Sequence, residues 1–385
     1  MAIKYKSLVE AYRGLPVSDA NRYLKQAISE GDVNENEFSL TELFVECFGS
    51  DAHNDCRRRK ESITKIMEAG DAVSSASFSN ISGQIVFSTV MDAFNQEANW
   101  ASALVPTVQS NFKSEKIPGV TEIGDEAAVV NEGEEYPTSG VSEDYIETPD
   151  TKKRGTIIPV TREAILFDRT NLLIERARDV GKWLGLNKEK RLLDMIIDEN
   201  STDHRYNWKG TVYGSYVATP WDNLSTGAAL VDYTDINAAL LKFAAMTDPA
   251  TGDPISIVPK QLIVDPSLQM TAFRILNSTR IDQGAISADI PITISASPIT
   301  SAYTLVTSSL LSARQVSASA AITSWYLGDV AAYGRYMQNW PMTVTQAPVN
   351  SELEFSRDIV MRFKASERGA AVVVQPRAIV KSTAA

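Results

Sequence analysis

The stretch GTIIPVTREAILFDRTNLLIERARDVGKWLGLNKEKRLLDMII, residues 155–197, decides the fold. Its opening, TIIPVTREAI, predicts a strand that runs into the start of a helix. No proline follows between Asp168 and Ile197, and most residues there favour helix. At 1.5 Å per residue such a helix is about 45 Å long, well above the usual length. The spacing predicts one buried stripe, made of Leu173, Ala177, Val180 and Leu184.

Two glycines interrupt this helix, and each costs about 1 kcal/mol relative to alanine. They are Gly181 and Gly185. We expect the close approach of another backbone to compensate for the cost. A local bend is the alternative explanation.

An acidic stretch precedes the strand and helix. Residues 117–151 contain ten acidic residues and no Lys or Arg, and then Lys152, Lys153 and Arg154 follow together. Glycines and prolines punctuate the stretch, which argues against a helix. We predict a long two-stranded hairpin with arms of roughly 40 Å. Because a lone hairpin is marginal in water, it should lie on another surface. A solvated loop is the simpler alternative.

The first hundred residues predict short helices separated by helix-breaking residues. One begins near Ser18 and ends at Ser29, and a second begins after Ser39 with the spacing of a capping box and ends before Gly49. Others are expected over 52–69 and 81–98. None has enough apolar surface to form a compact domain with its neighbours. We therefore expect an arm that packs on other subunits.

Helical and strand patterns alternate after Asp235. INAALLKFAAM predicts a helix, ISIVPKQLIVD a strand, and PSLQMTAFRIL a helix that begins at Pro266. Several short strands follow, and the chain closes with two more around Gly369. The order predicts an α+β fold with mixed sheets in two subdomains.

Composition excludes several classes of protein. The chain has 385 residues, 44% of them apolar, which is enough for a core. Its net charge of −11 argues against a dedicated nucleic-acid binder with a broad basic face. Two cysteines cannot form a disulfide scaffold, the segment MAIKYKSLVEAYRG lacks the apolar core of a secretory signal, and Ile290–Gly328 is too polar to span a membrane. We expect a cytoplasmic origin.

No catalytic or cofactor motif stands out. Cys47, His53 and Cys56 offer three metal ligands, with Asp51 or Asp55 as a fourth, but packing of the cysteines is the favoured interpretation. His204 has no Ser or Cys in a nucleophile motif to serve, and the nucleotide-binding motifs are missing. The basic run RRRK, residues 57–60, is more typical of a solvated helix face than of a nucleic-acid site. We expect neither an enzyme nor a cofactor.

The order of these parts resembles the major capsid proteins of tailed bacteriophages, which have the Hong Kong ninety-seven type of fold. The resemblance runs from about Ile81 to the end of the chain. An arm and an extended loop come first in this order. Three stretches then carry the resemblance: GTIIPVTREAI with its long helix, PKQLIVDPSLQMTAFRIL, and FSRDIVMRFKASERGAAVVVQPRAIVK. Residues before about Ser77 match nothing in that family.

The resemblance implies a division of the chain into four parts. Residues 1–110 would be a helical N-terminal arm, and 111–155 an extended acidic hairpin over an adjacent subunit. Residues 156–231 and 340–385 would form a peripheral subdomain, with the spine helix at about 168–197. Residues 232–339 would form the axial subdomain.

The implied function is structural. Many copies would assemble into pentamers and hexamers and close an icosahedral head shell around DNA, which is enclosed without sequence specificity. Scaffolding, portal and cement proteins are the implied partners, and the virion capsid, assembled in the bacterial host, is the implied location. An encapsulin-like compartment shell is the nearest alternative. No membrane contact is implied.

One feature of the family is missing. Some members join neighbouring subunits through a Lys on the extended loop and an Asn near the C-terminal strands. The stretch 117–151 has no Lys, so we expect no such cross-link at Asn350.

Charge complementarity instead predicts the subunit contact. The residues expected there are Glu132, Glu134, Glu135, Glu143, Asp144 and Glu147, with Lys152, Lys153 and Arg154 at the hairpin base. Further bases are expected on the long helix at Lys182, Lys188, Lys190 and Arg191.

Overall fold

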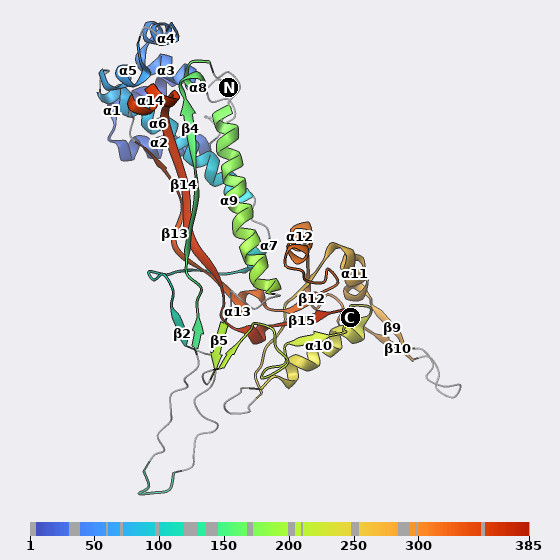
Figure 1. Ribbon diagram of the computed structural model, residues 1–385. Coiled ribbons are helices and arrows are strands. Elements are labelled where there is room, and N and C mark those ends of the chain that lie inside the picture. Colours follow the sequence, from blue (N-terminus) through green and yellow to red (C-terminus); the bar gives the residue numbers. More distant parts are fainter. Residues whose placement is uncertain are drawn as a thin grey trace. The chain divides into compact units, whose positions relative to one another are not determined.

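The chain has a mixed α+β structure (Figure 1), as predicted. The computed structural model describes residues 5–30, 39–58, 61–69, 72–96, 100–118, 130–135, 145–167, 172–198, 205–208, 211–247, 254–283, 293–297, 299–347 and 351–384. Within these ranges, no helix combines the length and the apolar content needed to cross a membrane.

The residues form two compact units. The first unit comprises Met1–Ala98, Lys153–Asn187 and Trp340–Arg368. The second comprises Asn99–Lys152, Lys188–Asn339 and Gly369–Ala385. Four long elements contribute residues to both units: α9 (Leu172–Ile197), β4 (Lys152–Thr161), β13 (Gly334–Gln346) and β14 (Ile359–Val373).

The first unit combines N-terminal helices with segments from much later in the chain. The helices are α1 (Tyr5–Gly14), α2 (Val17–Ser29), α3 (Leu40–Phe48), α4 (Ser50–Arg57), α5 (Ile63–Ala69), α6 (Ala72–Gln96), α8 (Arg162–Phe167) and α14 (Ser351–Arg357). Strands β13, β14 and β4 lie side by side in a sheet of order β1-β13-β14-β4. Its edge strand β1 (Thr107–Gln109) pairs in parallel with Tyr336–Gln338, and both of these segments belong to the second unit.

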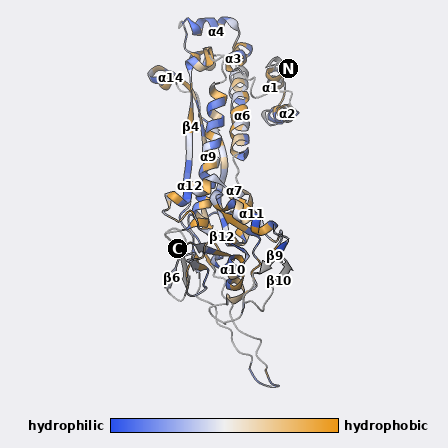
Figure 2. Cartoon of the chain, turned by 90° about the vertical axis from the view of Figure 1, so that its right-hand side faces the viewer, coloured by the Kyte–Doolittle hydropathy of each residue, from blue (hydrophilic) through white to orange (hydrophobic). Residues whose placement is uncertain are grey.

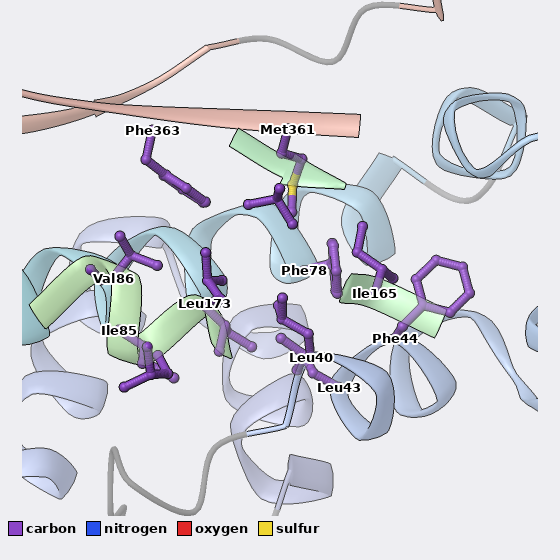
Figure 3. Packing of buried hydrophobic residues seen from close by; sticks show 14 of the residues in the cluster. Leu40, Leu43, Phe44, Phe78, Ile85, Val86, Ile165, Leu173, Met361 and Phe363 are labelled. Carbon is purple, nitrogen blue, oxygen red and sulfur yellow. The ribbon is translucent and has the colours of Figure 1, made fainter. Parts of the chain in front are cut away.

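A single hydrophobic cluster holds the first unit together. Figure 3 shows ten of its residues converging from four helices and a strand: Leu40, Leu43 and Phe44 of α3, Phe78, Ile85 and Val86 of α6, Ile165 of α8, Leu173 of α9, and Met361 and Phe363 of β14. The Phe44 and Phe78 rings meet edge to face at 5.8 Å between centroids.

The N-terminal helices take part in this cluster. Leu8 of α1, Leu24 of α2 and Phe44 of α3 are fully buried among the chain's own helices and strands. Several short helices therefore share one core, although none could form a domain alone. Contact of this region with other subunits stays a prediction.

The helix boundaries agree with the sequence for α2, which ends at Ser29 as predicted, and for α3, and they differ at two other places. Ser39 accepts a hydrogen bond from the Glu42 amide at the start of α3, and Gly49 ends that helix with φ +92°, as its position predicted. The helix expected over 52–69 is instead divided into α4 and α5. Helix α6 begins at Ala72, nine residues before the expected start at Ile81.

Helix α9 carries the predicted buried stripe. Leu173, Ala177, Val180 and Leu184 are all buried. Figure 2 shows hydrophobic and hydrophilic residues mixed along this helix, which is consistent with one covered and one open face.

The predicted close approach at Gly181 is confirmed. A Cβ atom built there would touch the Val90 carbonyl oxygen of α6 and would lie 2.8 Å from the Ala93 Cβ. Ordinary carbon–carbon contacts are about 3.5–4.0 Å. Only glycine therefore allows α6 and α9 to pack so closely.

The second unit is built on a five-stranded sheet of order β11-β8-β12-β15-β7. Its strands are β11 (Thr304–Thr307), β8 (Gln261–Val264), β12 (Trp325–Gly328), β15 (Ile379–Thr383) and β7 (Leu224–Thr226). The helix predicted from Ile236 is α10 (Tyr233–Ala245), which begins three residues earlier, with a capping box formed by Asp232 and Asp235. The predicted Pro266 helix start is a 3₁₀ turn, Pro266–Leu268, which continues into α11 (Gln269–Asn277).

The last strand lies in this sheet. β15 pairs with β12, antiparallel, and with β7, parallel. Residues from Gly369 onward therefore cluster with Lys188–Asn339, whereas the predicted division had grouped 340–385 with 156–231. Backbone pairing between β15 and β12 is the physical reason for the difference.

Three buried side chains cap the C-terminal end of α9. The Tyr216 hydroxyl donates to the Ile196 carbonyl at 2.6 Å, and the Tyr333 hydroxyl donates to the Met195 carbonyl at 3.2 Å. The Lys381 ammonium donates to the Ile197 carbonyl at 3.2 Å. Carbonyls at a helix end otherwise have no partner, and a cation there complements the helix dipole.

Candidate functional site

Two short antiparallel strands lie at the two ends of the acidic segment. β2 (Lys116–Pro118) pairs with β3 (Tyr145–Glu147), and β3 pairs on its other side with β5 (Arg205–Trp208), as Figure 1 shows. β5 pairs with β6 (Thr211–Tyr213), which completes a sheet of order β2-β3-β5-β6. The extended hairpin beyond β2 and β3 stays a prediction, because residues 119–129 and 136–144 lie outside the described ranges.

Hydrogen bonds and an ion pair close the base of this segment. The Glu115 amide donates to the Thr148 hydroxyl at 2.7 Å, and the Thr148 amide donates to the Glu115 carbonyl at 2.9 Å. Lys113 and Asp150 form an ion pair at 2.5 Å. The two ends of the acidic segment are thus held together.

One residue distant in sequence fixes the start of the segment. The Asn339 side-chain amide donates to the Ser110 carbonyl at 2.9 Å and to the Phe112 carbonyl at 2.8 Å. The sequence analysis missed this residue. No local pattern could have identified it, because its partners lie more than two hundred residues earlier.

The described acidic residues are open to solvent. Glu132, Glu134, Glu135 and Glu147 are all exposed. The Glu134 carboxylate accepts from the Asn131 side-chain amide at 3.1 Å, and Gly133 has φ +89° in the turn between them. Glu143 and Asp144 lie outside the described residues.

The predicted bases fall into two groups. Lys152, Lys153 and Lys190 are exposed, and Arg154 and Lys182 are partly exposed. Lys188 and Arg191 instead contact a tyrosine of their own chain: the Lys188 ammonium lies 4.6 Å from the Tyr336 ring centroid, and Arg191 donates to the Tyr336 hydroxyl at 2.9 Å. The contact of these acidic and basic groups across subunits stays a prediction.

A buried carboxylate that the sequence analysis did not single out lies in the first unit. Glu354 of α14 accepts from the Ser62 hydroxyl at 2.5 Å, from the Ile63 amide at 3.0 Å and from the Thr64 amide at 2.9 Å. Arg162 completes the site with an ion pair at 3.2 Å. Glu354 thus caps the start of α5 from a helix 290 residues away.

The environment of Glu354 has opposing effects on its acidity. Burial alone raises the pKa of the carboxyl, but hydrogen bonds from Ser62, Thr64 and Ile63 favour the charged form and bring the pKa below its ordinary value of 4.5. The carboxylate is therefore charged at neutral pH, and α14 is held firmly to the N-terminal helices.

The candidate metal ligands do not converge. Cys47 and Cys56 are buried and form no disulfide, and Nε2 of His53 lies 3.3 Å from the Leu166 carbonyl oxygen. Among the described residues, no group of three or more His, Cys, Asp or Glu side chains is arranged to hold a metal ion. His204 lies outside those residues.

Several large apolar side chains are exposed, which the sequence analysis also missed. The most exposed is Phe355 of α14, at 95%. Trp183 on α9 is 67% exposed, and Phe112 at the base of the acidic segment is 64% exposed. Single exposed apolar side chains are normal on protein surfaces, so these three residues do not by themselves mark an interface.

Three solved structures are similar to the chain. A structure from Mycobacterium phage Bobi is 16% identical, covers 74% of this chain and 90% of its own, and has a TM-score of 0.44. The capsid structure of the cyanophage P-SCSP1u is 14% identical, with 73% and 86% coverage and a TM-score of 0.44. The encapsulin complex from Synechococcus elongatus is 12% identical, with 74% and 86% coverage and a TM-score of 0.41.

No curated protein matches the chain. A sequence family described as phage capsid protein does match, over residues 145–382. The match extends from β3 to β15 and so includes α9 and the five-stranded sheet. It covers well over half of the 385 residues. The chain therefore belongs to the phage capsid protein family.

Proposed function

We propose that the chain is a major capsid protein whose copies assemble into pentamers and hexamers and close an icosahedral head shell around phage DNA. The family match over residues 145–382 carries the proposal. The role is structural, and no catalytic chemistry is required of the chain. Scaffolding, portal and cement proteins are the partners that such assembly in a host cytoplasm would use.

The acidic segment is the proposed subunit contact. Its base is closed by the Lys113–Asp150 ion pair, while Glu132, Glu134 and Glu135 are exposed. A segment with fixed ends loses less conformational freedom when it docks. Its carboxylates would face basic residues of a neighbouring copy, with Lys152, Lys153 and Lys190 as exposed candidates. Each exposed pair contributes only about 0.2–1 kcal/mol, but the contact repeats in every copy of a shell.

Electron microscopy of the expressed protein, with and without the products of neighbouring genes, tests the proposal. Closed icosahedral particles with five-fold and six-fold clusters are expected. Protein that stays monomeric or forms only open aggregates under all these conditions would contradict it.

An encapsulin-like shell is the second candidate, because a structure of that class is similar to the chain. Analysis of the contents of particles purified from their natural source distinguishes a phage head from an encapsulin-like compartment. Nuclease-protected DNA supports the phage head, whereas a packaged enzyme without DNA supports the compartment.

A further inference from the structure

Strand β14 has one covered face and one open face within the first unit. Met361 and Phe363 are buried in the hydrophobic cluster. Because successive side chains of a strand point to opposite faces, Arg362, Lys364 and Arg368 lie on the other face of the sheet. Lys364 is exposed there, and Arg362 and Arg368 are partly exposed. The charged groups that β14 presents on its open face are therefore all basic.

Strand β4 lies next to β14 in the same sheet, as Figure 1 shows. The Arg162 amide donates to the Asp358 carbonyl at 2.8 Å, near one end of both strands. Further along, a Cβ atom on Gly155 would lie 2.7 Å from the Ser366 Cβ. The two strands therefore run in opposite directions, and Gly155 lies opposite Ser366 on the open face.

Two side chains of β4 extend the open face. Counting two residues from Gly155 in each direction brings Lys153 to the level of Arg368 and Ile157 to the level of Lys364. Lys153 is exposed, and Ile157 is 54% exposed. Together these side chains form a basic face, which consists of Lys153, Ile157, Arg362, Lys364 and Arg368.

The electrostatics of the basic face favour an anionic partner. Its four charged side chains are all positive, and Ile157 is its only apolar member. The Arg368 guanidinium lies 5.4 Å from the Trp340 ring centroid. A guanidinium over an aromatic ring keeps donors at its planar edge, where a carboxylate binds. Neighbouring positive charges repel one another, so an acidic group that docks between them is favoured by charge complementarity.

The acidic segment carries a turn of matching charge, residues 131–135. The Glu134 amide donates to the Asn131 carbonyl at 3.1 Å, and the Glu134 carboxylate accepts from the Asn131 side-chain amide at 3.1 Å. Gly133 has φ +89°, which glycine adopts without strain. Glu132, Glu134 and Glu135 are all exposed. The turn thus presents three carboxylates on a backbone with a defined conformation.

We propose that this acidic turn of one copy docks on the basic face of a second copy of the chain. The inference rests on the proposed self-assembly, and it names the surface that receives the acidic segment, which is the open face of β4 and β14 rather than helix α9. Val130 precedes the turn and is partly exposed, so it supplies an apolar side chain to cover Ile157.

Packaged DNA is the other polyanion that a basic face could contact. The DNA backbone offers phosphates to basic side chains but no apolar group for Ile157. The net charge of −11 also opposes the approach of the chain to DNA. The acidic turn is therefore the favoured occupant, and DNA binding is an outcome that the test must distinguish.

The direct test is zero-length cross-linking of assembled parent protein. A carbodiimide joins a carboxylate to a lysine amine only where the two groups are in contact. Shells are assembled from equal amounts of copies labelled with light and heavy nitrogen, and the cross-linked peptides are identified by mass spectrometry. The expected peptides join Glu132, Glu134 or Glu135 of one copy to Lys153 or Lys364 of a differently labelled copy.

Charge reversal measures the contribution of the same contact to assembly. The double reversal Arg362→Glu with Lys364→Glu should raise the protein concentration needed for assembly by on the order of tenfold, because several weak attractions become repulsions. Lys65→Glu, on α5 of the same unit and exposed, is the matched control and should leave that concentration unchanged. Adding Glu132→Lys and Glu134→Lys to the double reversal swaps the charges and should bring assembly back towards the parent level.

The outcomes separate this contact from the proposed function, provided that circular dichroism shows every variant folded like the parent. Shells whose cross-links at the basic face do not exceed those at Lys65, cross-links confined to one copy, or a charge-swapped chain that assembles no better than the double reversal would overturn the contact while self-assembly stands. A double reversal that assembles like the parent but packages less DNA would overturn it in favour of a DNA contact. A parent protein that forms no shells would contradict both the contact and the proposed function.

Discussion

Adding one methyl group at Gly181 should force apart the two long helices of the first unit. In Gly181→Ala, the new Cβ would lie 2.8 Å from the Ala93 Cβ and even closer to the Val90 carbonyl oxygen. Carbon atoms in contact prefer about 3.5–4.0 Å, so α6 would have to retreat by roughly 1 Å. Both helices belong to the same hydrophobic cluster, so neighbouring contacts would loosen as well.

Two opposing effects set the size of the change. Alanine is favoured over glycine inside a helix by about 1 kcal/mol. Overpacking a core typically costs about 1–3 kcal/mol, and a clash with a backbone oxygen lies at the upper end because a carbonyl cannot rotate away. We expect a net destabilisation of about 2 kcal/mol.

Denaturant unfolding of the unassembled protein, followed by helical circular dichroism, measures this change. Gly14→Ala is the matched control, because a Cβ there meets nothing within 4 Å. The control should be neutral or stabilised by up to about 1 kcal/mol. If Gly181→Ala is as stable as the parent, or if both variants lose the same stability, the close approach of α6 and α9 does not explain the glycine.

Three further predictions test other parts of the account. Glu354→Gln should cost about 3 kcal/mol, because it leaves the partly buried Arg162 guanidinium without its charge partner. The parent's advantage over this variant, measured by unfolding, should be full above pH 4.5 and shrink as the pH falls through the lowered pKa of Glu354; an advantage independent of pH would contradict the assignment. Deletion of residues 1–76 should abolish folding of the first unit, because each large buried side chain that is lost contributes about 1.5–3 kcal/mol. A deletion product with the parent's unfolding midpoint would refute the shared core. Reversal of Glu132, Glu134 and Glu135 to Lys should weaken assembly while circular dichroism stays unchanged, and unaltered shell yield and salt response would leave those carboxylates only a solubility role.

Features with a local physical cause could be predicted from the sequence. The stripe on α9 follows from helical periodicity, and the start of α3 follows from a hydroxyl that can accept from the amide three residues on. The close packing at Gly181 follows from the cost of a glycine inside a helix.

Features that depend on distant partners could not be predicted from the sequence. The cap of α5 comes from Glu354, which lies 290 residues from Thr64, and nothing near either residue indicates the other. The N-terminal helices seemed too short to be stable because their covering strands, β4 and β14, come later in the chain. The same reason hid Asn339 at the base of the acidic segment.

The role of the exposed carboxylates in subunit contact remains a sequence-based prediction. A single chain presents Glu132, Glu134 and Glu135 to solvent, as an unassembled subunit must if these groups bind a neighbour. The same exposure is expected of a simple solubilising loop, so only assembly can distinguish the two.

Electron microscopy with image averaging of the purified, expressed protein tests the central claim most directly. The account predicts closed icosahedral shells in which this chain forms both the five-fold and the six-fold clusters. Folded protein that yields no shells, either alone or with the products of neighbouring genes, would contradict the claim.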